Sequence, residues 1–191
     1  MTQPEIQALL EKQKNYYRAG HTLPVNFRIN QLKKLYSSIK KHELEVKNAL
    51  SADLGKSFYE GFMCESGLAL SEISYMIRHT RKFSRRKTVR TPLAQFASHS
   101  FTQSVPYGNT LIMSPWNYPF LLSIDPLADA IAAGNTAIVK PSAYSPATSA
   151  VIEKIVTECF PPEYIAVITG GRAENAALLD QKFDFIFFTG S

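Results

Sequence analysis

Residues 110–142 read TLIMSPWNYPFLLSIDPLADAIAAGNTAIVKPS, and their pattern indicates the fold class. A short apolar run over 110–113 predicts a strand, and residues 119–133 predict a helix in which Pro126 should introduce a kink or begin a new turn. Gly134 and Asn135 then stop the helix, and a second apolar run follows over 136–139. A strand, a crossover helix and a second strand indicate a parallel βαβ unit.

The same alternation continues toward residue 191. We expect a helix over 146–159, which Pro161 and Pro162 break, a strand over 164–168, a short helix over 173–179 and an apolar strand over 184–188. The fold class is therefore α/β. Because no helix follows the last strand, we expect an incomplete sheet whose last strand is bare on one face.

The first ninety residues show helical periodicity instead. Apolar residues recur at helical spacing over 6–17, over 24–50 and again from about residue 57, which predicts amphipathic packing helices without chemistry of their own. Residues 96–104 alternate Phe96, Ser98, Ser100, Thr102 and Ser104, which is typical of an exposed strand or arm.

Composition narrows the function classes. The chain has 191 residues, of which 45% are hydrophobic and 19% charged, as in an ordinary globular protein. The net charge of +5 includes a basic cluster made of Arg78, Arg81, Lys82, Arg85, Arg86, Lys87 and Arg90. Cations are favourable at a helix C-terminus, so we interpret the cluster as a solvated helix end. No nucleic-acid-binding motif accompanies it, so we expect no nucleic-acid partner. The alternative is that the cluster binds nucleic acid, and steep salt-dependent association would support it.

The two cysteines, Cys64 and Cys159, show no CxxC or Cys/His grouping, which argues against a disulfide framework and a structural zinc site. We expect both to be small core residues and expect no metal. The N-terminus lacks the pattern of a signal peptide, and no apolar run approaches the roughly 18 residues of a spanning helix. We therefore expect a cytoplasmic protein.

Polar residues and glycines follow each predicted strand, at 114–117, 140–142, 169–171 and 189–191. Ligands of parallel α/β sheets bind at the carboxyl ends of the strands. Two prolines flank Asn117, whose amide could donate to a developing oxyanion; a turn or capping role is the alternative. Lys140, Gly170 and Gly171 also lie at these strand ends. Their purely structural interpretation is that Lys140 is a solvated strand end and that the two glycines form a turn that needs positive φ.

Four motifs in this order, SPWNYPF, AAGNTAIVKPS, a strand ending in TGG, and FDFIFFTGS, resemble the aldehyde dehydrogenase superfamily. The helical front resembles the class 3 branch, which takes fatty or aromatic aldehydes. The resemblance implies the N-terminal part of an NAD(P)-dependent enzyme that oxidises aldehydes to carboxylic acids. It also implies a division into a helical portion of the cofactor domain (1–94), an arm like the family's oligomerisation hairpin (95–106) and an incomplete Rossmann-like NAD(P)-binding portion (107–191).

The resemblance assigns roles to individual residues. Asn117 would be the side-chain donor of the oxyanion hole, and Tyr118 would line the substrate tunnel. Trp116 would lie beside the cofactor, with ordinary core packing as its alternative. The residues implied in binding NAD or NADP are Trp116, Lys140, Ser142, Gly170, Gly171, Gly190 and Ser191.

One position departs from the family pattern. A glutamate that binds the ribose 2'-hydroxyl usually follows three residues after the counterpart of Lys140, and this chain has Ala143 there. A carboxylate at this place would repel a 2'-phosphate, so its loss makes NADP acceptable beside NAD.

In the family, the general-base glutamate and the nucleophilic cysteine both come later in the chain than the counterpart of residue 191. Neither Cys64 nor Cys159 has the sequence context of that nucleophile, so we expect these 191 residues alone to be inactive. A homodimer is implied for the full-length enzyme. A hypothesis from another class is a non-catalytic nucleotide-binding or interaction fragment, which titration with NAD and NADP would distinguish.

Overall fold

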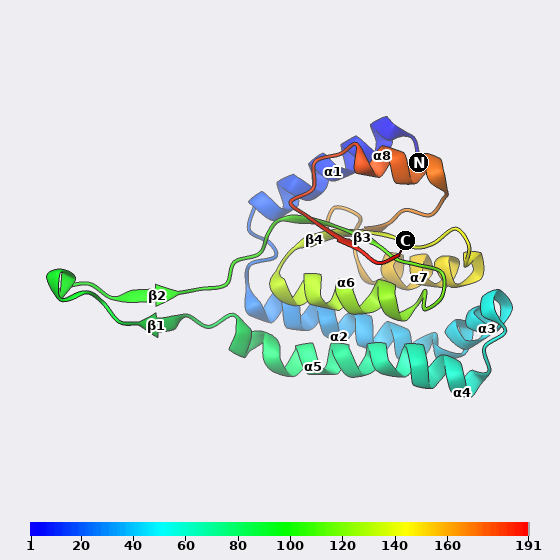
Figure 1. Ribbon diagram of the computed structural model, residues 1–191, viewed down its shortest axis with the longest axis horizontal. Coiled ribbons are helices and arrows are strands. Elements are labelled where there is room, and N and C mark those ends of the chain that lie inside the picture. Colours follow the sequence, from blue (N-terminus) through cyan, green and yellow to red (C-terminus); the bar gives the residue numbers. More distant parts are fainter. Residues whose placement is uncertain (191) are drawn as a thin grey trace.

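The computed structural model describes residues 1–190, and its parallel sheet has the strand order β5-β4-β3-β6 (Figure 1). The strands are β3 (Asn109–Met113), β4 (Thr136–Lys140), β5 (Ile165–Val167) and β6 (Phe185–Phe188). In the centre of the sheet Ile138 pairs with Leu111 and with Ala166, and Leu111 pairs with Ile186, always in parallel. The predicted α/β class and parallel sheet are confirmed.

Three helices connect these strands: α6 (Leu121–Ala133), α7 (Pro146–Cys159) and α8 (Arg172–Leu179). The steps from β3 to β4 to β5 advance in one direction, whereas the next step returns to the far side of β3. The winding therefore reverses between β3 and β6, at the kind of switch point where doubly wound sheets bind ligands. Helix α6 continues across Pro126, so no new turn begins there.

Helices cover both faces of the sheet. Helices α2, α3 and α5 pack with α6 and α7 over one face, and α1 and α8 lie over the other (Figure 1). The bounds of these N-terminal helices are α1 (Gln3–Arg18), α2 (Val25–Lys41), α3 (Glu43–Leu54), α4 (Phe58–Gly61), a π-helical turn (Phe62–Ser66) and α5 (Gly67–Phe83).

The single helix predicted over 24–50 is wrong, because the chain breaks at His42 between α2 and α3. His42 has φ −99° and ψ 15°, outside helical geometry. Its buried ring lies between two carboxylates, with Nδ1 2.8 Å from Glu45 and Nε2 2.6 Å from Glu158. Glu158 belongs to α7, so a tertiary contact accompanies the break, and no local glycine or proline marks it in the sequence.

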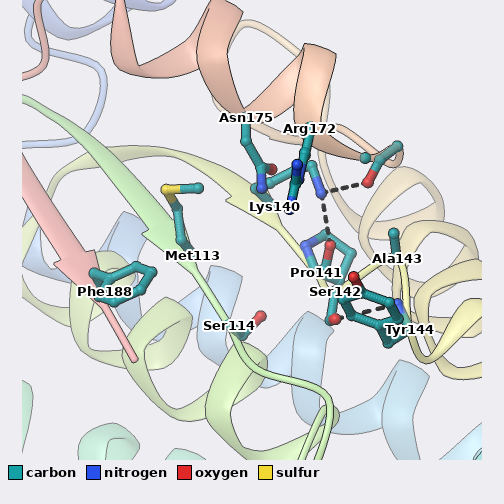
Figure 2. A pocket seen from close by; sticks show the side chains of 12 residues that line it. Met113, Ser114, Lys140, Pro141, Ser142, Ala143, Tyr144, Arg172, Asn175 and Phe188 are labelled. Carbon is teal, nitrogen blue, oxygen red and sulfur yellow. Dashed lines mark hydrogen bonds between the residues drawn. The ribbon is translucent and has the colours of Figure 1, made fainter. Parts of the chain in front are cut away.

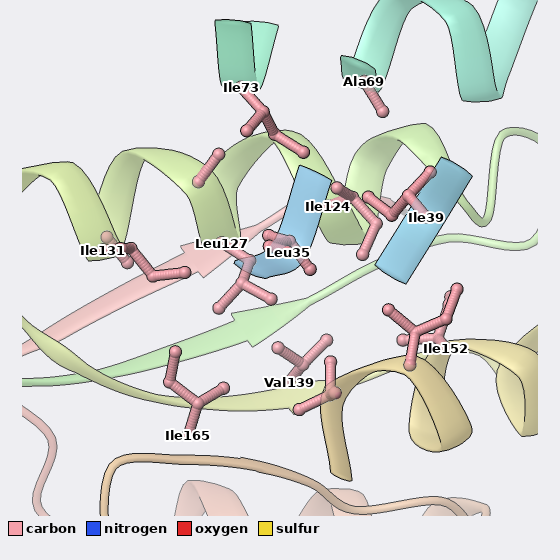
Figure 3. Close-up of a cluster of buried hydrophobic side chains, with 14 of the residues drawn as sticks. Leu35, Ile39, Ala69, Ile73, Ile124, Leu127, Ile131, Val139, Ile152 and Ile165 are labelled. Atoms are coloured by element: carbon pink, nitrogen blue, oxygen red, sulfur yellow. The ribbon is translucent and has the colours of Figure 1, made fainter. Parts of the chain in front are cut away.

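Two apolar clusters hold the layers together. The larger one contains Val139 of β4 together with Leu127 of α6, Leu35 of α2 and Ile73 of α5 (Figure 3). The neighbouring residue Ile138 belongs to the smaller cluster on the opposite face. Strands β3 and β4 are thus buried on both faces, as central parallel strands should be, and this fixes the residues at their carboxyl ends.

Strand β6 lies at the edge of the sheet, with its side chains between 38% (Phe187) and 60% (Phe188) exposed. Because successive side chains of a strand point to opposite faces, β6 is exposed on both faces, whereas one bare face is expected from the sequence.

A two-stranded antiparallel hairpin projects away from the body (Figure 1). Its strands are β1 (Lys87–Val89) and β2 (Ser100–Thr102), so the alternating segment 96–104 supplies only one of them. The other strand, β1, begins in the basic cluster. The interpretation of this cluster as a solvated helix end is therefore wrong at Lys87. The Arg86 guanidinium joins the strands, because it lies 4.4 Å from the Phe101 ring centroid and donates to Gln103 Oε1 at 2.8 Å.

Both cysteines are partly exposed, so neither is a fully buried core residue as predicted, although Cys159 packs against the larger apolar cluster. Cys64 lies in the π-helical turn and Cys159 ends α7, where burial raises the pKa of its thiol. Across residues 1–190, no group of three His, Cys, Asp or Glu side chains is arranged to hold a metal ion. Among the helices of that range, none combines the length and apolar character needed to cross a membrane.

The stability of the chain should fall between pH 5 and pH 8 because of Asp125 and Asp129 on α6. Burial, and then repulsion from Glu72 of α5, raises the pKa of Asp125 to about 7; the same two causes raise the pKa of Asp129 to about 6. Between an ordinary carboxyl pKa and these values the folded chain binds more protons than the unfolded chain, so the free energy of unfolding falls as pH rises.

The Asp125→Asn variant removes one of these ionisations. It should be more stable than the parent at pH 8 by about 1–2 kcal/mol, a value reduced because solvent screens a side chain that is only partly buried. Urea denaturation at pH 5 and pH 8 measures this difference, with the exposed Asp180→Asn as the matched control. An Asp125→Asn variant that keeps the parent's pH dependence would contradict the assignment.

Candidate functional site

A pocket of about 260 Å³ opens at the carboxyl ends of the strands (Figure 2). Met113 at the end of β3 and Phe188 at the end of β6 lie on its wall, so the pocket includes the switch point of the sheet. Its lining consists of Met113, Ser114, Lys140, Pro141, Ser142, Ala143, Tyr144, Gly170, Gly171, Arg172, Asn175 and Phe188.

Lys140 is the buried cation of this pocket and is only 3% exposed. Its Nζ donates to the carbonyl of Pro141 at 2.9 Å and to the carbonyl of Gly170 at 2.7 Å. Burial lowers the pKa of the ammonium, and the Glu174 carboxylate opposes part of that effect. An ammonium has three N–H donors, so one has no partner among residues 1–190. The alternative of a solvated strand end is wrong.

Gly170 allows the loop after β5 to approach Lys140. Its φ is +132°, and an added Cβ would lie 2.4 Å from Glu174 Oε2. The same carboxylate accepts the N–H of Gly171 at 2.8 Å, which fixes the start of α8. Gly171 itself has φ −110°. The interpretation as a positive-φ turn therefore holds for Gly170 and fails for Gly171.

Ser142 shapes the opposite wall of the pocket. Its Oγ accepts the N–H of Tyr144 at 3.2 Å, and its carbonyl accepts from Ser149 Oγ at 2.9 Å. These bonds turn the chain after β4, so that Ala143 and Tyr144 both line the pocket.

Sequence reasoning missed Arg172 and Asn175, which α8 contributes to the pocket (Figure 2). Asn175 Oδ1 is buried and has no hydrogen-bond partner in the described part of the chain. A signal existed, because Arg172 directly precedes the helix predicted over 173–179 and Asn175 lies on that helix. A ligand that donates a hydrogen bond would satisfy this acceptor.

Asn117 lies on the loop that joins β3 to α6, outside this pocket, and its side chain is exposed. Its carbonyl accepts from Lys56 Nζ at 2.9 Å, and its Oδ1 accepts the N–H of Tyr118 at 3.1 Å. No hydrogen bond between described residues uses its Nδ2. The amide oxygen is thus turned toward the backbone, and the amide NH2 group remains available as a donor.

Trp116 is 54% exposed and Tyr118 is 40% exposed, so core packing is wrong for Trp116. The structure brings Lys140, Ser142, Gly170 and Gly171 together in one pocket, and places Trp116, Asn117 and Tyr118 on the loop outside its lining. Gly190, with φ +150°, follows β6 and lies against the ring of Phe188. Ser191 lies outside the described residues.

The chemistry of the pocket suits an anionic, hydroxyl-bearing ligand. It offers one free ammonium donor on Lys140, the guanidinium of Arg172 and the unpaired acceptor of Asn175, beside the N-terminal turn of α8. Ribose hydroxyls and phosphates provide the complementary groups, so the residues present fit a nucleotide cofactor.

Known proteins are similar to this chain in sequence and in architecture. A family model described as the aldehyde dehydrogenase family matches residues 1–191. The chain is 42% identical to 4,4'-diaponeurosporen-aldehyde dehydrogenase of Staphylococcus aureus over 93% of its own length and 39% of that protein. It is 37% identical to aldehyde dehydrogenase family 3 member H1 of Arabidopsis thaliana, over 98% of this chain and 39% of that one.

Among solved structures, the substrate-bound state of Staphylococcus aureus AldH superposes with a TM-score of 0.95 at 41% identity, covering 97% of this chain and 41% of that chain. The chain therefore spans about two fifths of the length of these relatives.

Proposed function

The chain belongs to the aldehyde dehydrogenase family, and from that membership we propose that it is the N-terminal part of an NAD(P)-dependent enzyme oxidising aldehydes to carboxylic acids. The observation that carries the proposal is the buried Lys140 ammonium, which keeps one donor free in a pocket at the switch point of a parallel sheet. Residues 1–94 would form the helical part of the cofactor domain, residues 95–106 an oligomerisation arm and residues 107–191 the NAD(P)-binding part.

Lys140, Ser142, Gly170 and Gly171 would hold the adenosine end of NAD or NADP, because they line one pocket beside a free donor. Gly190 and Ser191 would approach the pyrophosphate and Trp116 the rest of the cofactor. The bound cofactor would supply the acceptor for a hydride.

Asn117 would stabilise the aldehyde oxygen as negative charge develops on it. Its exposed NH2 group has no other partner among the described residues, and the hydrogen bond to Tyr118 N–H holds the amide in one orientation. A preorganised donor of this kind acts mainly on the transition state. Tyr118, beside it on the loop, would line the path of the substrate.

The 191 residues alone would not complete the reaction. Cys64 and Cys159 are the chain's two thiols, and neither lines the pocket around Lys140. Burial raises the pKa of Cys159, which reduces the thiolate needed for attack on an aldehyde. The proposed role of this segment is to bind the cofactor and present the oxyanion donor.

The projecting hairpin would serve assembly of the whole enzyme as a homodimer. Leu93 and Phe96 near its tip are 90% and 85% exposed, and both strands offer a free edge. Free strand edges beside exposed apolar side chains are typical of a surface that pairs with another chain.

A chimeric enzyme tests the function directly. In it, these 191 residues replace the matching segment of the Staphylococcus aureus relative, with which the chain shares a TM-score of 0.95. Aldehyde-dependent formation of NADH or NADPH is expected from the chimera and not from the 191-residue chain. A correctly folded chimera without activity would contradict the proposal.

Arg172 should favour NADP over NAD. It lines the same pocket as Ala143, so a cation and no carboxylate would face the 2' position of the ribose. The Arg172→Ala variant should weaken NADP binding about tenfold and NAD binding less than about twofold, since a phosphate–arginine pair is charge-assisted. Calorimetric titration of the chain measures both affinities. Arg78→Ala, outside the pocket, is the control, and an equal loss for both cofactors would contradict the assignment.

A further inference from the structure

A buried ion pair lies beneath the loop that carries Asn117. Lys56 Nζ is 2.5 Å from Glu65 Oε1, and the two side chains are 8% and 0% exposed. Lys56 stands between α3 and α4, and Glu65 lies in the π-helical turn before α5. Burying two charges is costly unless each finds further hydrogen-bond partners.

Within residues 1–190, all the further partners of this pair belong to residues 117–121. Glu65 Oε2 accepts the N–H of Phe120 at 2.8 Å and the N–H of Leu121 at 3.2 Å. Lys56 Nζ donates to the carbonyl of Asn117 at 2.9 Å and lies 4.1 Å from the centroid of the Tyr118 ring. The ion pair therefore binds both ends of the segment 117–121.

Ordinary capping does not explain the arrangement. The first N–H groups of a helix are usually satisfied by a Ser, Thr, Asp or Asn at the N-cap, a few residues away. Helix α6 has Phe120 at that position, and the acceptor comes instead from Glu65, 55 residues earlier in the chain. The π-helical turn that carries Glu65 is a feature that often occurs at functional sites.

We propose that Lys56 and Glu65 are positioning residues that fix the direction of the Asn117 amide. Lys56 binds the backbone carbonyl of Asn117, and the Tyr118 N–H binds its side-chain oxygen. With both oxygens held, the NH2 group of the amide can point in only one direction. The catalytic meaning of this tether rests on the function proposed above for Asn117. The tether itself can be measured on the 191-residue chain.

Trp116 provides the readout, because it is the single tryptophan of the chain and is adjacent to Asn117. In the Lys56→Met variant the loop loses the cation that holds it, so it should move more freely on the nanosecond scale. The amplitude of the fast local component of the Trp116 fluorescence anisotropy decay should therefore grow about twofold. Glu65→Gln, which is nearly isosteric and neutral, should have the same effect in a smaller degree. If Lys56→Met does not fold, the Glu65→Gln variant tests whether the ion pair restrains the loop.

Asp53→Ala is the matched control for a merely structural effect. The Asp53 carboxylate accepts the N–H groups of Ala147 at 3.1 Å and Thr148 at 2.7 Å at the start of α7. This variant should lower the urea midpoint of unfolding and leave the Trp116 decay unchanged. Lys56→Arg, which keeps a cation and its donors, should restore the parent decay. The proposal is overturned if the folded Lys56→Met or Glu65→Gln chain retains the parent decay.

Titration of the same preparations with NADP separates the two proposals, since neither Lys56 nor Glu65 lines the cofactor pocket. A loosened Trp116 without cofactor binding in any preparation would support the tether and contradict the proposed function. An unchanged Trp116 with normal cofactor binding would overturn the tether and leave the proposed function standing.

Discussion

Replacing Asn117 by alanine in the chimeric enzyme should lower kcat for aldehyde oxidation roughly 100- to 1000-fold. Its Nδ2 has no partner among the described residues, and its two oxygen atoms are already engaged by Lys56 and the Tyr118 N–H. The lost interaction would therefore be one that forms with the oxyanion. Because such a donor acts on the transition state more than on the bound aldehyde, KM should change little.

Steady-state kinetics of two further variants sharpen this test. Asn117→Asp replaces the donor by a carboxylate, which repels a developing oxyanion, so its loss should be at least as large. Asn48→Ala changes an exposed asparagine on α3 and should leave the rate unchanged. A loss smaller than about fivefold in Asn117→Ala would contradict the assigned role.

Replacing Lys140 by methionine should lower the affinity of the chain for NAD and NADP about 10- to 100-fold, because a hydrogen bond from a charged donor contributes roughly 1.5–3 kcal/mol. Methionine has a similar length and no charge, so it removes the donor with little change in volume. Both cofactors should be affected, in contrast to the selective effect of Arg172→Ala.

Calorimetry on the 191-residue chain measures this loss, and Lys12→Met, on the exposed side of α1, is the control. Since Lys140 also binds two carbonyls, circular dichroism should accompany the titration to show that the variant is folded. Parent-like affinity in a folded Lys140→Met chain would exclude this lysine from the cofactor site.

The sheet was predictable from sequence because its signals are local. Strands β3 and β4 are short apolar runs that end at Met113 and Lys140, and glycine or proline interrupts the connections. Parallel strands place their carboxyl ends at one edge, so Lys140, Ser142 and Gly170 could be assigned to one pocket before any coordinates.

The features that sequence reasoning missed depend on contacts between distant segments. The break at His42 accompanies a contact with Glu158, and the support of the Asn117 loop comes from Lys56 and Glu65. Strand β1 lies in a basic segment with little apolar pattern and forms only by pairing with β2. Periodicity reports which face of an element is apolar and not which distant partner it meets.

The cysteines show a second limit. Small apolar residues are usually buried, but Cys159 lies at the end of α7, where the helix layer meets solvent. Residue type alone does not distinguish the middle of a helix face from its rim.

The most direct test of the central claim is a titration of the ¹⁵N-labelled 191-residue chain with NAD and with NADP, followed by amide chemical shifts. We expect saturable shifts with a Kd below about 1 mM for both cofactors, centred on Ser142, Gly170, Gly171 and Arg172. Absence of shifts at saturating cofactor, or shifts confined to surfaces away from this pocket, would contradict it.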